Sequence, residues 1–145
     1  MRKRSAYRPK AKVLPVLFRH SEADDRQLQL VPHAELEKFR HGLGDEVSIN
    51  TLAFRLNFGY VLAREFFESA ALTEVLTSGL NALRSVIERK QRTGKVGAMM
   101  PEFEAMGEAL VHTDQMQLKC TRKEMNDAIM KVINEAAIDA KELKL

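Results

Sequence analysis

The stretch LTEVLTSGLNALRSVI, residues 72–87, decides the fold. Its apolar residues recur at steps of three and four, which places them on one face of a helix with about 3.6 residues per turn. These residues are Leu72, Val75, Leu76, Leu80, Leu83, Val86 and Ile87. The stretch therefore predicts a one-sided amphipathic helix. The basic run that follows suits a helix C-terminus, and Gly94 can end the helix there.

Residues 49–67 predict a second helix with a broader apolar surface. The residues that repeat at helical steps are Leu52, Ala53, Leu56, Leu62, Phe66 and Phe67, and those that widen the surface are Phe54, Phe58 and Val61. A helix that is apolar on several sides is usually central to its domain. Asp45 or Ser48 can cap its first turn. We expect a break near residues 69–71 before the next helix, and one continuous helix is the alternative.

Start and stop signals predict three further helices. Pro32 suits the first turn of a short helix that Gly42 and Gly44 end, and Pro101 restarts a helix after a short loop. Thr121 and Glu124 have the spacing of a capping box, which predicts the start of the last helix. The apolar residues expected to be buried on that helix are Met125, Ala128, Ile129, Val132, Ile133 and Ala136.

Together these elements predict an all-α fold, a small bundle of four long helices and one short helix. Short connections make neighbouring helices antiparallel. We expect three parts: a basic arm over residues 1–12, an extended segment over residues 13–31 that packs on the body, and a helical bundle over residues 32–145. Within the middle part, residues 20–25 suggest a turn, and the alternating pattern of residues 26–31 suggests a short extended stretch.

The charge of the 145-residue chain is unevenly distributed. The net charge is +3, yet the first twelve residues, MRKRSAYRPKAK, contain six cations and no acidic residue. The rest therefore holds 17 of the 23 Lys and Arg residues against all 20 Asp and Glu residues. A mildly acidic body argues against a fold whose whole surface coats nucleic acid.

Several classes of protein are disfavoured by composition. The single cysteine, Cys120, cannot form an internal disulfide or a cysteine-rich zinc site. No apolar h-region follows the basic N-terminus, as a secretory signal requires, and the most apolar stretch contains Arg55 and Arg64, which disfavours a membrane span. We expect a soluble cytoplasmic protein with no membrane partner.

No pattern of catalytic residues is found. His20, His33, His41 and His112 lack the spacing of a metal site, and His112 and Asp114 point apart on a helix because they are two residues apart. Cys120 precedes a helix N-terminus, which can lower a thiol pKa, but no base stands near it in sequence. We therefore expect no enzyme, no cofactor and no metal.

Two basic segments are the candidate binding residues. The first comprises Arg2, Lys3, Arg4, Tyr7, Arg8, Lys10 and Lys12, and the second comprises Arg89, Lys90, Arg92 and Lys95. Cations bind phosphates, and Tyr7 could stack on a base. Basic segments also bind acidic protein partners, so both kinds of partner remain open at this point.

The opening MRKRSAYRPK resembles the start of a group of small uncharacterised proteins encoded by phages and prophages of Gram-negative proteobacteria. The similarity extends to Ile49–Leu52, Gly79–Val86 and Asp114–Met116. The resemblance implies a viral origin and expression in a bacterial cytoplasm. It implies no activity, so no functional residue carries over.

The sequence thus suggests a non-enzymatic phage accessory protein that binds another protein, with a host factor as one candidate partner. The alternative is a nucleic-acid-associated protein that uses its basic arm as a non-specific electrostatic tether. We also expect a homodimer or larger oligomer, because the apolar surface of residues 52–67 looks too broad for one small bundle to cover.

Overall fold

The computed structural model describes residues 22–144, with side chains described between residues 29 and 135. This part of the chain contains five α-helices and one π-helical turn. The elements are α2 (Glu22–Arg40), α3 (Glu46–Val61), η2 (Leu62–Phe66), α4 (Ala70–Thr93), α5 (Met100–Lys119) and α6 (Arg122–Lys144). Over residues 22–144 there is no strand, which confirms the all-α prediction for them.

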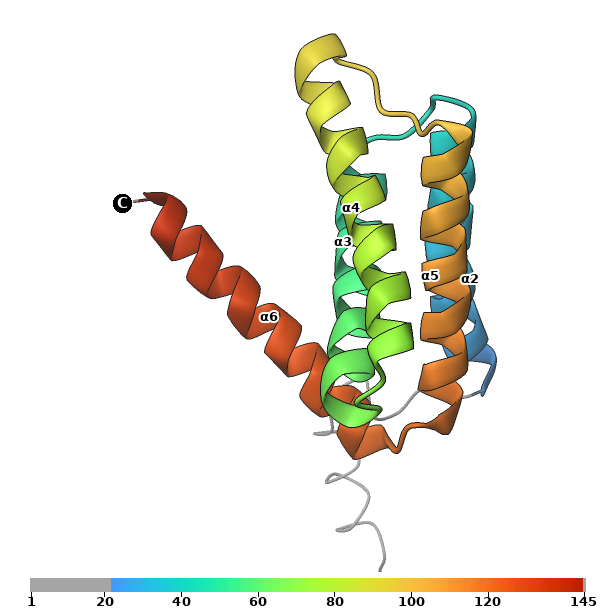
Figure 1. Cartoon of the computed structure of the whole chain (residues 1–145), viewed down its shortest axis with the longest axis vertical. Helices are drawn as coiled ribbons and strands as arrows, with labels where there is room; N and C mark the ends of the chain where they lie inside the picture. The colour runs from blue at the N-terminus through green and yellow to red at the C-terminus, as the bar shows by residue number, and fades with distance from the viewer. Residues whose placement is uncertain (1–21, 145) are drawn as a thin grey trace, which may run out of the picture.

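Helices α2 to α5 form an antiparallel bundle, and α6 diverges from it (Figure 1). Helix α3 contacts α2, α4, α5 and α6. Its apolar residues Leu52, Leu56 and Phe58 are almost completely buried. The predicted central position of this helix is therefore confirmed. The breadth of its apolar surface is explained by its many neighbours within one chain.

Glycine allows the central helices to approach closely at two points. A Cβ atom on Gly59 of α3 would lie 2.1 Å from Thr113 Oγ1 of α5. A Cβ atom on Gly79 of α4 would lie 2.6 Å from the Cβ atom of Ala109, also on α5. Real Cβ atoms do not approach other atoms so closely, so these glycines fix how near the helices can pack.

The predicted helix boundaries in the body are largely confirmed. Asp45 is the N-cap of α3 and accepts a hydrogen bond from the Ser48 N–H at 2.9 Å, while the Asp45 N–H donates to Ser48 Oγ at 3.3 Å. Ser69 caps α4, which confirms the break before that helix. Gly94 ends α4 with a positive φ of 79°, a conformation that glycine adopts without steric cost.

Helix α2 begins ten residues earlier than predicted. The turn at residues 20–25 and the extended stretch at 26–31 are wrong from residue 22 onward, because α2 is helical from Glu22 and contains Pro32 in its interior. Proline removes one helical hydrogen bond. Pro32, Leu36 and Phe39 are nevertheless all buried, one helical turn apart, and α2 packs on α3 and α5. Leu30, which suggested the period-two pattern, is exposed.

Helix α2 is therefore a long helix of 19 residues, so the prediction of one short helix is wrong. It also crosses the boundary proposed at residue 32. The basic arm and residues 13–21 of the extended segment lie outside the described residues, and the division of the chain into three parts stays a prediction.

Helix α6 buries fewer of its apolar side chains than its sequence pattern predicted. Ala128 and Val132 are buried, and Met125 and Ile129 are partly buried, as predicted. Ile133 is 48% exposed, which is contrary to the prediction. The helix contacts α3 and η2 near its start and then leaves the bundle (Figure 1), so the end of its apolar pattern has fewer neighbours.

Candidate partner-binding site

Two loops meet at the end of the bundle where α4 finishes. The α4–α5 loop lies against the loop between α2 and α3: the Ala98 N–H donates to the Phe39 carbonyl at 3.0 Å, and the Gly44 N–H donates to the Val96 carbonyl at 3.2 Å. Arg89 Nη1 also donates to the Gly97 carbonyl at 2.9 Å. These hydrogen bonds hold the two loops against each other, so that together they form one surface.

Two of the predicted binding cations have carboxylate partners in the body. Arg89 Nη2 lies 2.7 Å from Glu102 Oε2, and this hydrogen bond raises the pKa of Arg89. Lys90 forms an ion pair with Glu46 at the start of α3. Both contacts tie the end of α4 to neighbouring helices, so these cations have a structural role that the sequence pattern did not reveal.

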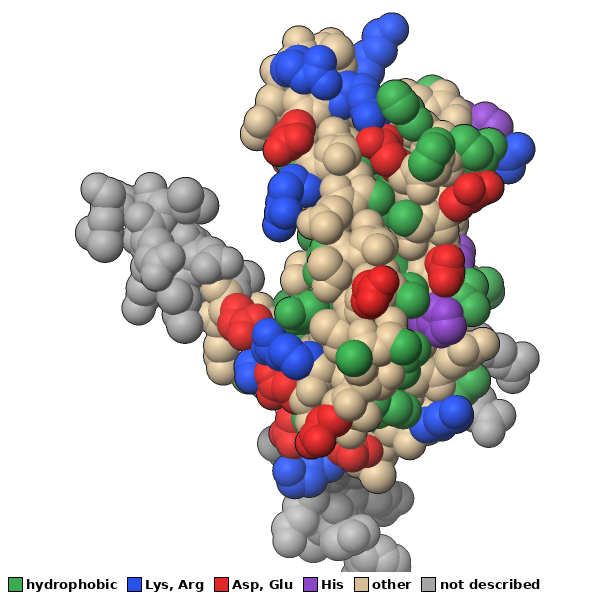
Figure 2. All heavy atoms as spheres, viewed as in Figure 1, with side chains coloured by type: hydrophobic (Ala, Val, Ile, Leu, Met, Phe, Trp, Pro, Cys, Tyr) green, Lys and Arg blue, Asp and Glu red, His purple; other side chains and the backbone are tan. Residues whose placement is uncertain are grey.

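The other two predicted cations of this cluster, Arg92 and Lys95, differ from Arg89 and Lys90. Both side chains are exposed, and neither has a carboxylate partner among the residues whose side chains are described. Figure 2 shows basic side chains gathered over this end of α4, with hydrophobic side chains beside them over the start of α5. The charge available to a partner at this end therefore comes mainly from Arg92 and Lys95.

A groove of about 500 Å³ lies between the two loops and the end of α4. Phe39, Ala98 and Met99 supply apolar lining, and the cationic residues of the lining are Arg40, Arg89 and Lys95. None of the lining residues is acidic. At its edge Met99 is 56% exposed, and the next residue, Met100, is 57% exposed. The groove thus combines apolar side chains with positive charge.

The candidate binding residues of the basic arm lie outside the described residues: they are Arg2, Lys3, Arg4, Tyr7, Arg8, Lys10 and Lys12.

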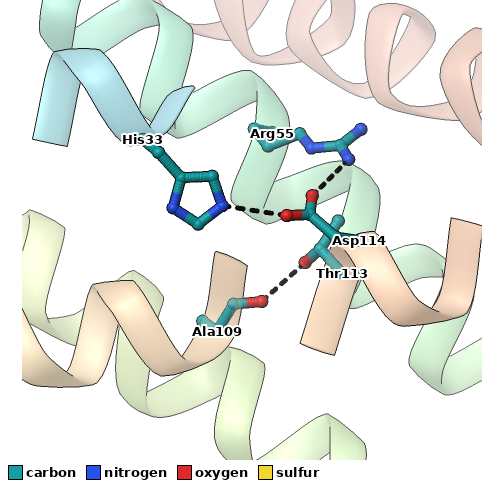
Figure 3. Close-up of polar contacts among 5 residues, drawn as sticks. All are labelled: His33, Arg55, Ala109, Thr113 and Asp114. Carbon is teal, nitrogen blue, oxygen red and sulfur yellow. Dashed lines mark hydrogen bonds and ion pairs between the residues drawn. The ribbon is translucent and has the colours of Figure 1, made fainter. Parts of the chain in front are cut away.

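A partly buried polar cluster, which sequence reasoning missed, lies between α2, α3 and α5. Arg55 Nη2 donates to Asp114 Oδ1 at 2.7 Å, and His33 Nε2 lies 2.8 Å from Asp114 Oδ2. Figure 3 shows Arg55 and His33 approaching the carboxylate from two sides. Beside Asp114 on the same helix, the Thr113 hydroxyl donates to the Ala109 carbonyl at 2.8 Å, which satisfies it locally.

Arg55 is the most deeply buried charge of this cluster. It is 9% exposed, its guanidinium lies 5.2 Å from the centre of the Phe58 ring, and its Nε atom has no hydrogen-bond partner. Burial lowers the pKa of Arg55, although the bond to Asp114 opposes this effect. Since a buried charge is costly without a partner, an arginine within an apolar helix was the available signal for this cluster.

The polar cluster lies beside a hollow of about 370 Å³, lined by Gln29, Leu30, His33 and Asp114. A histidine held by a carboxylate can serve as a catalytic base. Within the described residues, however, His33 makes its hydrogen bond to Asp114 and none to a hydroxyl or thiol. The arrangement joins three helices and supplies no nucleophile.

The other two histidines with described side chains and the cysteine are dispersed, and His20 lies outside the described residues. His41, just after the end of α2, lies 3.5 Å from Glu37 of that helix, and His112 lies 3.9 Å from Glu108, one turn away on α5. Burial raises the pKa of Cys120, and Glu124 adds to this effect, so the lowered thiol pKa that its position allowed is not found. The described part of the chain contains no group of three potential ligands placed to hold a metal ion.

Comparison with protein-family models, curated proteins and solved structures gives no match for this chain. Among the described helices, none is both long and apolar enough to cross a membrane.

Proposed function

We propose that this chain is a non-enzymatic phage or prophage accessory protein that binds another protein in the bacterial cytoplasm. One observation carries the proposal: the exposed side chain of Met99 lines the same groove as Lys95, and the next residue, Met100, is exposed as well. Methionine adapts to varied apolar surfaces, and apolar groups surrounded by polar ones are common in protein interfaces. The resemblance of the N-terminus to phage proteins supports the proposed origin.

The proposal is tested by affinity capture from lysate of a Gram-negative host, followed by mass spectrometry. The wild type is compared with a Met99→Ser/Met100→Ser variant and with a chain lacking residues 2–12. Leu118→Ser is the matched control, since Leu118 is exposed at the opposite end of α5. We expect one partner to be retained by the control and lost by the methionine variant.

Each candidate partner is then purified, and its affinity for the four chains is measured directly. Loss of binding in the methionine variant alone supports the proposal. Failure of the wild type to bind any captured protein, or turnover of a nucleotide by the purified chain, contradicts it.

A nucleic-acid tether is the alternative function. The six cations of the arm favour it, together with Arg92 and Lys95, which have no carboxylate partner among the residues whose side chains are described. Affinity for an unspecific DNA duplex should then fall steeply with salt, because phosphate contacts release counterions. Deleting residues 2–12 should abolish that binding. Duplex binding that survives the deletion would contradict the tether.

Self-association stays part of the proposal, but the apolar surface that would support it differs from the one that the sequence suggested. Most of the apolar surface of residues 52–67 is buried within one chain, and Phe54 remains 40% exposed. Exposed apolar residues on α6, Met130 and Ile133, offer a further surface. The mass in solution at micromolar concentration is the test, and a monomeric mass counts against an oligomer.

A further inference from the structure

We infer that the groove at the α4–α5 end binds an acidic peptide segment carrying a large apolar side chain. The inference rests on the proposed protein-binding function and specifies the chemistry of the partner.

The shape of the groove suits a side chain on an extended or helical segment. Its volume of about 500 Å³ falls within the range of about 300–1,000 Å³ typical of ligand sites. Ala98 contributes to an apolar lining, Phe39 lies completely buried behind it, and Met99 stands at the edge. Because backbone hydrogen bonds join Phe39 to Ala98 and Gly44 to Val96, the walls are fixed before a partner binds.

The charge of the groove selects an acidic partner. Arg40 and Arg89 each contact a carboxylate, Glu37 at 3.0 Å and Glu102 at 2.7 Å, and neither carboxylate lines the groove. Lys95 has no carboxylate partner within the described residues. A glutamate or aspartate of the partner would therefore find Lys95 available. Complementary charge of this kind gives specificity and speeds association.

A peptide fits these observations better than a nucleic acid does. Strong binding of a phosphate backbone requires several cations, whereas within the described part of the chain only Arg92 and Lys95 lack a carboxylate partner at this end of α4. The apolar lining would leave phosphates desolvated without partners. Phe39 is fully buried and offers no exposed ring on which a base could stack.

The experiment measures fluorescence anisotropy of a labelled peptide, EEDFLEE, with the full chain at low salt. The peptide EEDSSEE removes the apolar side chains, and KKKFLKK reverses the charge. We expect EEDFLEE to bind, and both control peptides to bind at least about tenfold more weakly, a loss of about 1.4 kcal/mol.

Variants of exposed residues locate the binding. Lys95→Glu and Met99→Ser should each weaken EEDFLEE binding roughly tenfold. Lys119→Glu, an exposed cation at the opposite end of α5, should leave it unchanged. Circular dichroism of each variant checks that the fold is intact.

Three outcomes overturn the inference. One is binding that is unaffected by Lys95→Glu and Met99→Ser. Another is binding that disappears when residues 2–12 are deleted and does not depend on the groove. The third is equal binding of single-stranded DNA at the same site, shown by competition with the peptide and by the same loss in Lys95→Glu.

If a protein partner is still captured by Lys95→Glu and Met99→Ser, the groove inference fails while the proposed function stands. If no partner is captured by any chain, both fail.

Discussion

Arg55 of α3 and Asp114 of α5 are 59 residues apart in sequence and form an ion pair of 2.7 Å inside the bundle. His33 of α2 contacts the other oxygen of the same carboxylate at 2.8 Å. One aspartate thus joins three helices. Charges that leave water gain stability only where their partners are well placed, so this cluster fixes the relative position of the three helices more than it adds to stability.

Replacing Asp114 by alanine should therefore destabilise the protein strongly. The change leaves the buried guanidinium of Arg55 without a counter-charge. Breaking a buried pair in this way costs about 3–5 kcal/mol, and we expect the lower end, about 3 kcal/mol, because the Asp114 side chain is 21% exposed. Urea denaturation followed by circular dichroism measures the loss.

Two further variants separate a lost charge pair from a merely damaged helix. Asp127→Ala removes the carboxylate of an exposed pair with Lys123 on α6 and should leave the denaturation midpoint nearly unchanged. Arg55→Met combined with Asp114→Leu replaces both charges by apolar groups and should recover much of the stability. If the double variant is as unstable as Asp114→Ala, the unpaired charge is not the cause.

The body of the fold could be predicted from sequence because its signals are local. Gly94, Ser69 and the Asp45–Ser48 pair act within one or two helical turns, so their roles follow from spacing alone. Ion pairs between helices are different. Arg89 and Lys90 looked like free cations in the sequence, and they are paired with Glu102 and Glu46 from other helices. Only the packing of the helices reveals which cations remain available.

At the start of α2, by contrast, a local signal in the sequence predicted the wrong helix boundary. Pro32 is a strong local indication of a helix start, yet it lies in the interior of α2. The cost of one missing hydrogen bond is offset by packing of Leu36 and Phe39 against α3 and α5. The same reasoning applies to Asp114: its distance along the chain from His33 and Arg55 hid the cluster from any argument based on spacing.

Gly59→Ala should destabilise the bundle although alanine favours a helix. The new Cβ atom would meet Thr113 Oγ1 at 2.1 Å and Leu76 Cδ1 at 2.8 Å, so α4 or α5 has to move. Overpacking of a core typically costs about 1–3 kcal/mol, which exceeds the gain of about 1 kcal/mol from helix propensity. Thermal unfolding measures the difference.

Gly107→Ala is the matched control for this change. Gly107 also lies within a helix, and the nearest atom to its new Cβ, Leu36 Cδ2, is 3.7 Å away, an ordinary contact distance. The substitution should stabilise the protein by up to about 1 kcal/mol. A stabilised Gly59→Ala variant would show that α3 and α5 are not held at the distance described.

Acid should loosen the attachment of α6 to η2. A hydrogen bond from Lys131 of α6, and a second from Arg64, hold the pKa of Glu65 below its ordinary value of 4.5. A carboxyl whose pKa is lowered on folding stabilises the fold above pH 4.5, and the stabilisation is lost as the pH falls below that value through the folded pKa. The protection of the α6 amides, measured as the exchange rate of the unfolded chain divided by the observed rate at the same pH, should therefore fall below pH 4.5.

Glu65→Gln isolates this contribution from other carboxylates that titrate in acid. The variant should be less stable than the wild type at neutral pH, and the difference should shrink as the pH falls below 4.5. A difference between the two proteins that stays constant over this range would show that Glu65 does not hold α6 through its charge.

Thr121→Ala should cost about 1 kcal/mol through loss of the cap on α6. Thr121 Oγ1 accepts a hydrogen bond from the Glu124 N–H at 3.1 Å, and the Thr121 N–H donates to Glu124 Oε1 at 2.9 Å, so the capping box is present as predicted. Thr121→Ser retains an accepting hydroxyl and should keep most of the stability. Because α6 has few neighbours beyond its first turns, amide exchange should increase from the cap along the helix in Thr121→Ala. Exchange unchanged from the wild type would mean that contacts with α3 and η2 hold the start of α6 without the cap.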